Sequence, residues 1–389
     1  MMVRTDSRAI LTGLFALCVL SVASAKPLKV YILAGQSNMQ GKPSVHVLQH
    51  GLQDSPETRR LHNMLVDDEG NPRVFEGVHV AAVSTGPNEK NGPLTVGFGN
   101  DLTDKRGLRW GPELPFGAAM TEKLGEPILI IKTAWGGKSL NTDFLSPSGA
   151  KLREGKETGK YYKLMVDYVE KVLAEPGRYH PAYDANEGYE LAGFVWFQGW
   201  NDMVNKKLYP ENKPDRYSLY SKLLAHFIRD VREDFNAPKM PFVIGVMGIG
   251  GEDFQAAMAA PAAMPEFKDN VVAVHTKKYI DAKLWELIDR GWRWQRARWD
   301  PENKYTELRE KLKPLQKELN ESKKIKDAGE RRAKQRDIKA RMESIKYSPE
   351  EKDYLKRNKS SQGFHYNGSP KYFARIGVAF ADAILEMAE

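Results

Sequence analysis

The chain alternates short runs of apolar residues with longer stretches in which apolar residues recur every three or four positions. The short runs are typical of buried strands, and the longer stretches are typical of amphipathic helices. We predict strands at residues 29–33, 78–83, 128–132, 191–197, 242–247 and 271–275. We predict helices at residues 116–124, 161–173, 217–234 and 370–387. This alternation predicts an α/β fold with a parallel sheet covered on both faces, and it places the chemistry at the carboxyl ends of the strands.

One segment breaks the alternation, because residues 303–358 lack strand-like runs and are dense in Lys, Arg and Glu. Apolar side chains recur there at heptad spacing in two stripes, Leu308, Leu312, Leu315 and Leu319, then Ile338, Met342 and Ile345. The residues Asp327-Ala328-Gly329 can turn the chain between the stripes, and we expect Pro314 to kink or interrupt the first helix. The pattern predicts a charged helical hairpin at residues 303–358, inserted into a core domain of residues 26–302 that residues 359–389 complete.

The first 25 residues have the features of a cleaved signal peptide. Arg4 and Arg8 precede an apolar run at 10–22, and Ala23-Ser24-Ala25 is a small-residue cleavage site. The apolar run is short for a bilayer span, so we expect an exported protein, periplasmic or secreted, with no membrane span after cleavage. The single cysteine, Cys18, lies in this segment, which excludes a cysteine nucleophile, a disulfide or a cysteine metal site in the mature chain.

The net charge of +8 is concentrated in one part of the chain. Residues 304–357 hold 18 Lys and Arg against 11 Asp and Glu, so the rest of the mature chain is close to neutral. A localised excess of this kind does not indicate a nucleic-acid-binding fold. The acidic loops at 67–69 and 101–104 are typical of solvated surface, and we predict no metal site.

A serine in a tight turn follows the first predicted strand, in the sequence Gly35-Gln36-Ser37-Asn38-Met39. Nucleophilic serines are often displayed at such a strand end, near backbone N–H groups that can bind an oxyanion. Helix capping is the commoner role of a serine at this position. Ser37 is therefore a candidate nucleophile that needs support from other parts of the chain.

Two further polar blocks follow predicted strands. The first contains Gly136 and Gly137, whose backbone can approach a ligand closely and offer an oxyanion N–H. The second contains Gln198 and Asn201, whose side-chain amides can bind the same oxyanion. His365 lies in a short polar loop before the last helix and is the leading candidate for the general base. Candidates for substrate contact complete the site, namely Gln36, Asn38, Trp135 and Trp200.

Together the blocks Gly-Gln-Ser-Asn-Met, Trp-Gly-Gly-Lys-Ser-Leu, Trp-Phe-Gln-Gly and the late His-Tyr resemble the SGNH (GDSL-like) hydrolases. The most similar branch is that of sialate O-acetylesterase-like and carbohydrate esterase family six enzymes, which Gly-Pro-Glu-Leu-Pro-Phe-Gly at 111–117 also resembles. The resemblance covers roughly residues 27–280 and 360–388. It implies a flavodoxin-like three-layer sandwich and serine-dependent removal of acetyl groups from carbohydrate hydroxyls, without a cofactor. It also implies that Ser37 is the nucleophile and His365 the base, and the Gln-Gly match slightly favours Gln198 over Asn201 as the amide donor to the oxyanion.

The chain departs from that family at one position. The family usually carries an aspartate three residues before the histidine, and here the position is Gln362, with Ser361 before it. Either another carboxylate, such as Asp281, Asp289 or Glu113, supports His365, or the enzyme works as a Ser-His dyad, or it is inactive.

Two rival functions follow from this sequence, besides carbohydrate deacetylation. One is an esterase of the same scaffold for lipid, aryl or thioester acyl groups, and the other is a non-catalytic glycan-binding protein. The hairpin is either a plain structural insertion or a contact surface for an acidic polysaccharide or another anionic surface.

Overall fold

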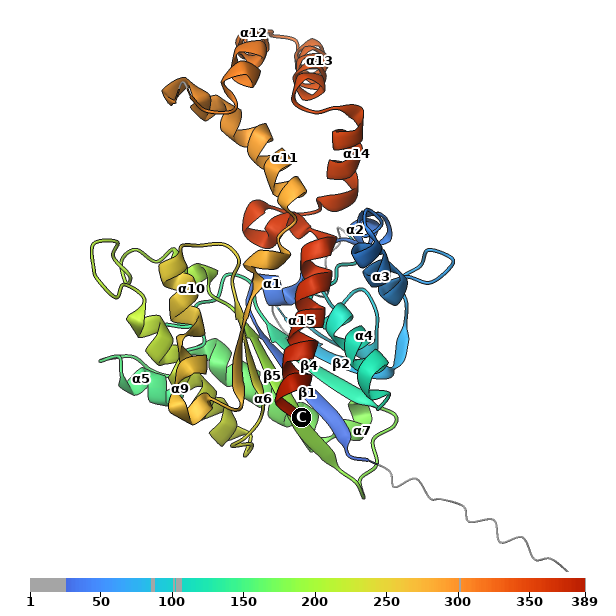
Figure 1. Cartoon of the computed structure of the whole chain (residues 1–389), viewed down its shortest axis with the longest axis vertical. Coiled ribbons are helices and arrows are strands. Elements are labelled where there is room, and N and C mark those ends of the chain that lie inside the picture. The colour runs from blue at the N-terminus through green and yellow to red at the C-terminus, as the bar shows by residue number, and fades with distance from the viewer. Residues whose placement is uncertain (1–25, 85–87, 101, 103–106, 301, 389) are drawn as a thin grey trace, which may run out of the picture.

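The computed structural model describes residues 26–84, 88–100, 102, 107–300 and 302–388, so the expected signal peptide lies outside the described residues. Seven strands form one sheet in the order β3-β2-β4-β1-β5-β6-β7 (Figure 1). Neighbouring strands are parallel except β2 and β3, which are antiparallel. The strands are β1 (Leu28–Gly35), β2 (Phe75–Val83), β3 (Glu89–Leu94), β4 (Ile128–Ala134), β5 (Tyr189–Phe197), β6 (Phe242–Val246) and β7 (Val271–His275).

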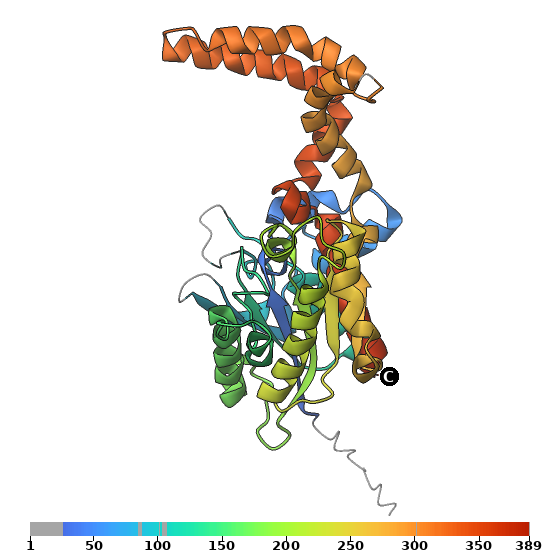
Figure 2. The same cartoon turned by 90° about the vertical axis from the view of Figure 1, so that its left-hand side faces the viewer.

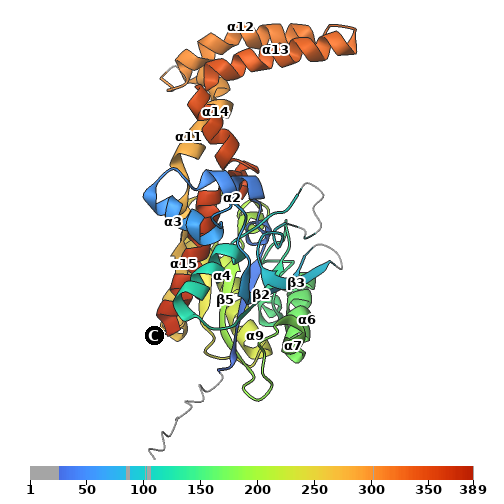
Figure 3. The same cartoon turned by 90° about the vertical axis from the view of Figure 1, so that its right-hand side faces the viewer.

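Helices cover both faces of the sheet and give three layers. Figure 3 shows α4 (Glu113–Leu124) and α15 (Pro370–Ala388) on one side, and α6 (Lys160–Ala174) and α7 (Pro176–Tyr179) on the other. Alternate residues of β5 reach opposite layers, because Trp196 packs on Phe227 of α9 (Ser218–Asp234) and Phe197 packs on Phe380 of α15. The sequence-based prediction of a three-layer α/β sandwich is therefore confirmed.

Shorter helices lie in the connections of the core. They are α1 (Ser37–Gln40), α2 (Val45–Gly51), α3 (Pro56–Leu65), α5 (Pro147–Lys151), α8 (Trp200–Met203) and α10 (Glu252–Ala259), with 3₁₀ turns η1 (Ala260–Ala263), η2 (Pro265–Phe267), η3 (Thr276–Tyr279) and η5 (Gly363–Gly368). Within the described part of the chain, no helix has the length and apolar character that crossing a membrane requires.

The three central strands end at the same level. In the sheet register, Gly35 at the end of β1 pairs with Ala134 of β4 on one side and with Phe197 of β5 on the other. The chain also crosses from one half of the sheet to the other at β1, and crevices at such switch points are usual ligand sites in open α/β sheets. The residues that follow these three strands therefore meet at one point of the edge.

A helical arm projects from the end of the core where α1 lies (Figure 1). Figure 2 shows its two parts, a stalk of α11 (Ala282–Arg293) and α14 (Pro349–Asn358), and a hairpin of α12 (Thr306–Ser322) and α13 (Ala328–Lys346) that lies across the stalk. The 3₁₀ turn η4 (Trp294–Trp299) joins α11 to the loop before α12. The predicted hairpin at 303–358 thus corresponds to α12, α13 and α14, and α11 and η4 before it complete the arm.

The apolar seam of the hairpin largely follows the predicted stripes. Leu312, Ile338 and Met342 are buried together, and Leu308, Leu315 and Leu319 pack against them. Ile345 is an exception, because 39% of it is exposed and the second stripe ends one turn early. The expected interruption at Pro314 is also wrong: α12 continues through this residue, with the buried Leu312 and the seam residue Leu315 on either side.

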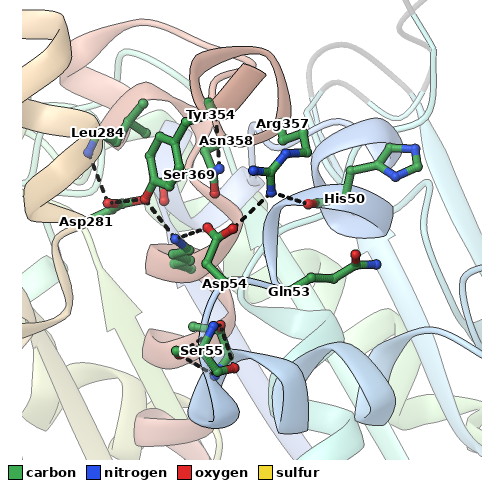
Figure 4. A network of polar contacts seen from close by, with 12 residues as sticks. His50, Gln53, Asp54, Ser55, Asp281, Leu284, Tyr354, Arg357, Asn358 and Ser369 are labelled. Carbon is green, nitrogen blue, oxygen red and sulfur yellow. Dashed lines mark hydrogen bonds and ion pairs between the residues drawn. The ribbon is translucent and has the colours of Figure 1, made fainter. Parts of the chain in front are cut away.

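A polar network fastens the stalk to the core (Figure 4). Asp281 caps α11 by accepting from the Leu284 N–H (3.0 Å) and also accepts from the Tyr354 hydroxyl of α14 (2.8 Å). Lys371 of α15 donates to the Tyr354 hydroxyl (2.7 Å) and to Asp54 (2.5 Å), and Arg357 donates to Asp54 as well (2.9 Å). Burial opposes ionisation of Asp54, but these two cations outweigh it and lower its pKa. The network ties both stalk helices to the helix that closes the core.

Candidate active site

Ser37 begins α1, two residues after the last residue of β1. It lies at the edge of the sheet where β1, β4 and β5 end together. Gly35 has a φ of +152°, and a Cβ atom there would lie 2.2 Å from the carbonyl oxygen of Phe197, so only glycine fits between the two strands. The Gln36 N–H then donates to that same oxygen (3.3 Å). This tight turn lifts Ser37 out of the strand, and its side chain is buried except for 8% of its surface.

A buried ion pair supports the turn from beneath. Lys132 of β4 donates to the Gln40 carbonyl at the end of α1 (2.9 Å), to the Phe98 carbonyl (2.9 Å) and to Glu113 (2.6 Å). The other oxygen of Glu113 accepts from the Gly111 N–H (2.9 Å). Burial lowers the pKa of Lys132, and the charge of Glu113 opposes this. Glu113 therefore holds the nucleophile turn and is not free to support a histidine.

Gly136 lies against the nucleophile. After β4, the Trp135 N–H donates to the Gly35 carbonyl (3.1 Å), which keeps the two strand ends together. A Cβ atom at Gly136 would lie 3.7 Å from Ser37 Cβ and 2.9 Å from Gln40 Oε1, so glycine allows the backbone to approach the serine. Gly137 follows with a φ of +72°, which also favours glycine.

Gln36 orients Asn201. The Gln36 Oε1 atom accepts from the Gly199 N–H (3.1 Å), and its Nε2 group donates to Asn201 Oδ1 (3.3 Å). The Asn201 amide is thereby turned with its oxygen toward Gln36. Its Nδ2 group donates no hydrogen bond to any residue that the structure describes. Asn201 thus presents an amide donor at the edge, held by a residue from the neighbouring strand.

Gln198 does not present a donor in the same way. Its Nε2 group donates to the Lys138 carbonyl (3.0 Å) and to Asp202 (2.7 Å), and its Oε1 accepts from the Tyr220 hydroxyl (3.2 Å). Both amide hydrogens are engaged in the protein, so the geometry argues against the expectation that Gln198 is the favoured oxyanion donor.

Asp202 is a positioning residue that the sequence reasoning did not assign. Its fully buried carboxylate accepts from the N–H groups of Leu140 (2.7 Å) and Asn141 (3.0 Å), and from the amide groups of Asn141 (2.6 Å) and Gln198. Burial raises its pKa, and these four hydrogen bonds oppose the rise. Asp202 joins the loops after β4 and β5, and its place directly after Asn201 was the available signal.

His365 approaches the edge on a compact loop. Asn38, next to the nucleophile, donates through Nδ2 to the Phe364 carbonyl (3.2 Å). The Phe364 ring lies 5.9 Å from the Trp200 ring, so the loop contacts the blocks after both β1 and β5. The Ser360 and Ser361 N–H groups donate to the Asn367 carbonyl, both at 2.9 Å, and close the loop on itself. The structure therefore brings the His365 loop onto the turn that carries Ser37.

No carboxylate supports the His365 ring within the described ranges. The ring nitrogen Nδ1 lies 3.2 Å from the Ser361 hydroxyl. Of the three carboxylates considered, Glu113 pairs with Lys132, Asp281 accepts from Tyr354, and Asp289 accepts from Tyr305 (2.8 Å). Burial first, and then the positive charge of Lys42, lower the pKa of His365 from 6.5 to about 4. The imidazole is therefore neutral at physiological pH and unaccompanied by an acidic partner.

Comparisons with known proteins identify the family. The family model described as carbohydrate esterase, sialic acid-specific acetylesterase, matches residues 27–283, which is more than half of the chain. The chain belongs to this carbohydrate esterase family. A comparison with the sequences of curated proteins gave no match.

Two solved structures are similar to this chain. One is a protein from Arabidopsis thaliana, with 19% identity, a TM-score of 0.39, and coverage of 64% of this chain and 86% of that one. The other is a carbohydrate acetylesterase from Xanthomonas citri, with 14% identity, a TM-score of 0.38, and coverage of 63% of this chain and 49% of that one. The match thus spans about half of the Xanthomonas protein.

Three of the four residues expected to contact substrate have other contacts in the structure. Trp135 is 4% exposed, donates to the Ser84 carbonyl (2.9 Å) and packs in the core. Gln36 and Asn38 are each 2% exposed and position Asn201 and the His365 loop, as described above. Only Trp200 remains half-buried at the edge, where its role in substrate binding stays a prediction.

A polar cavity of about 430 Å³ adjoins His365. Its lining comprises Lys42, Asn100, Arg109, Ser360, Ser361, Gln362, Phe364 and His365. Apart from the Phe364 ring, these side chains are polar or charged, which suits a hydroxyl-rich ligand better than a long acyl chain. No group of three or more His, Cys, Asp or Glu in the described ranges is arranged to hold a metal ion.

Proposed function

We propose that this carbohydrate esterase removes O-acetyl groups from carbohydrate hydroxyls, with Ser37 as nucleophile and His365 as general base. The observation that carries the proposal is the level ending of β1, β4 and β5, which gathers Ser37, Gly136 and Asn201 at one point. The hydrogen bond from Asn38 to Phe364 adds the histidine loop to the same point.

In the acylation step, the Ser37 hydroxyl oxygen attacks the acetyl carbonyl carbon while His365 Nε2 takes the hydroxyl proton. The carbonyl oxygen becomes an oxyanion, bound by the backbone N–H groups of Ser37 and Gly136 or Gly137 and by Asn201 Nδ2. When the tetrahedral intermediate collapses, the imidazolium returns the proton to the sugar oxygen. The sugar leaves as a free alcohol, and the acetyl group stays on Ser37.

In the deacylation step, His365 takes a proton from water, and the resulting oxygen attacks the acetyl-enzyme. Acetate leaves, and the proton on His365 returns to the Ser37 oxygen. No cofactor takes part in either step. The Ser361 hydroxyl lies 3.2 Å from Nδ1, and the mechanism requires the tautomer in which Nδ1–H donates to this hydroxyl and Nε2 is free to accept the serine proton. This arrangement is a Ser-His dyad in which a hydroxyl takes the place of the usual aspartate.

The direct test is hydrolysis of p-nitrophenyl acetate and of acetylated xylan by the wild type and the Ser37→Ala variant. We expect the variant to lose several orders of magnitude in turnover, because both steps pass through the acyl-enzyme. A serine-directed organophosphate should label Ser37 in the wild type. Labelling of another serine, or equal turnover in the variant, would overturn the nucleophile assignment.

A second candidate function is non-catalytic glycan binding, which the missing carboxylate at His365 favours. It predicts binding of acetylated oligosaccharide without acetate release, and no organophosphate labelling. The polar lining of the cavity beside His365 disfavours the third candidate, an esterase for long apolar acyl groups. We further propose that residues 1–25 direct export, which N-terminal sequencing of the mature protein from culture fractions would test.

A further inference from the structure

The hairpin of the arm carries a second hollow, far along the chain from the catalytic residues. This hollow, which we call the arm groove, has a volume of about 720 Å³ and lies between η4 and α12. Six basic side chains line it, namely Arg296, Arg298, Arg309, Lys313, Lys317 and Lys324. The only acidic residue among its described lining is Glu321.

The charge of the arm groove is only partly neutralised by the protein. Arg309 and Lys313 both pair with Glu310, at 2.8 and 3.6 Å. In the portion of the chain that the structure describes, Arg296, Arg298, Lys317 and Lys324 have no ion-pair partner. Elsewhere on the hairpin, by contrast, Lys334 and Arg341 of α13 share Glu318. Arg332, Arg336 and Lys339 of α13 also have no ion-pair partner among the described residues, but they do not line the arm groove.

The groove also presents aromatic surface. Trp294 is 4% exposed and packs into the seam of the arm, whereas Trp299 is 76% exposed. The Arg298 guanidinium lies over the Trp299 ring, 4.5 Å from its centroid, which makes a flat, positively charged surface. Tryptophan and arginine are the residues that most often dominate binding energy at interfaces.

Trp299 and the basic residues of the groove lie outside the buried apolar cluster of the arm. The apolar stripe of α12 already has its partner in Ile338 and Met342, and the basic residues lie on the other side of that helix. Arg309, Lys313 and Lys317 repeat every four residues over roughly 12 Å of α12, and Lys324 follows just beyond the end of that helix. An elongated polymer with regularly spaced negative charges matches this row.

We propose that the arm groove binds an anionic polysaccharide chain whose sugars carry carboxylates, with Trp299 stacking on a sugar ring. The choice of a polysaccharide over other polyanions follows from the carbohydrate esterase family of the same chain. The arm projects from the end of the core where α1 and Ser37 lie, so a held polymer is presented on the catalytic side (Figure 1). That this polymer is also the substrate rests on the proposed function, whereas its binding does not.

The test measures binding of polygalacturonate to the full chain in a Ser37→Ala background, by calorimetry over a range of salt concentrations. The groove variants are Lys313→Glu/Lys317→Glu and Trp299→Ala. The matched controls are Arg332→Glu/Arg336→Glu, the same charge change on α13, and Trp292→Ala, which is 74% exposed but outside the groove lining. Thermal melts establish that each variant is folded.

We expect affinity that falls as salt rises, a loss of roughly tenfold or more in each groove variant, and little change in either control. Equal losses in groove and control variants would show an effect of net charge alone and overturn the site. Tighter binding to single-stranded DNA, or to vesicles of phosphatidylglycerol and phosphatidylcholine in equal parts, would overturn the polysaccharide assignment.

With Ser37 restored, the groove variants should hydrolyse p-nitrophenyl acetate normally and lose activity on acetylated pectin. Normal activity of the groove variants on both substrates would overturn the link between the groove and the substrate. If the wild type hydrolyses neither, the proposed esterase function fails while the binding result stands.

Discussion

The low pKa of His365 leads to a specific prediction about the pH dependence of kcat/KM. A general base must be neutral to accept the serine proton, so kcat/KM follows the neutral fraction of the imidazole in the free enzyme. With a pKa of about 4, which burial and then Lys42 produce, roughly 90% of the imidazole is neutral at pH 5. With the ordinary pKa of 6.5, only about 3% is neutral at that pH. The ratio of kcat/KM at pH 5 to that at pH 7.5 should therefore be about 0.9, against about 0.03 for an unperturbed histidine.

The assay is p-nitrophenyl acetate hydrolysis at substrate concentrations below KM, from pH 4 to pH 8, with each sample quenched into alkali before absorbance is read. Rates for Ser37→Ala are subtracted as background, and circular dichroism at each pH establishes that the protein is folded. Lys42→Met should move the acid limb upward only in part, because burial is the larger cause of the shift. An acid limb centred between pH 6 and pH 7 in the wild type would refute the reasoning.

Three further predictions address the partners of the dyad and the arm. Asn201→Ala should lower turnover by roughly 10²- to 10³-fold with little change in KM, because it removes an oxyanion donor; unchanged turnover would point to backbone donors alone. Gln362→Asp places a carboxylate in the cavity that holds His365 and should raise its pKa, so activity should rise at pH 8 and fall at pH 5. Gln362→Asn is the control, and pH profiles that coincide for the two variants would contradict this. Replacing residues 303–346 with a Gly-Ser linker keeps α11, α14 and the Asp54 network, so hydrolysis of p-nitrophenyl acetate should stay close to wild type. Its loss in a variant with a normal thermal melt would show that the hairpin shapes the catalytic site.

The sheet was largely predictable because six of its strands contain runs of β-branched and other apolar residues. Residues 29–33, for example, lie within β1, and 128–132 lie within β4. The exception is β3 (Glu89–Leu94), whose polar residues, glycine and proline give no strand pattern. It is an edge strand with one partner, and proline and glycine are tolerated at such positions.

The sequence predicted which loops form the site, but not which side chains of those loops face the substrate. The strand-end rule places Ser37, Gly136 and Asn201 on the correct edge. The choice between Gln198 and Asn201 depends on two other residues. Gln36, in the turn after β1, orients the Asn201 amide, and Asp202 engages the Gln198 amide. The state of His365 depends on what surrounds it in space, and sequence spacing cannot supply that. Long-range contacts of this kind are fixed only when the whole fold is in place.

The two members of the dyad come from opposite ends of the chain, and this sets an order of assembly. Ser37 follows the central strand, whereas His365 precedes α15, which must dock against α4 before the histidine loop has a surface to rest on. A chain that lacks the last helix would still contain His365 but would lose Tyr372, on which Tyr366 of the His365 loop stacks. Catalytic activity should therefore appear only after the C-terminal segment has folded. Recovery of activity during refolding would then measure the formation of the complete native structure.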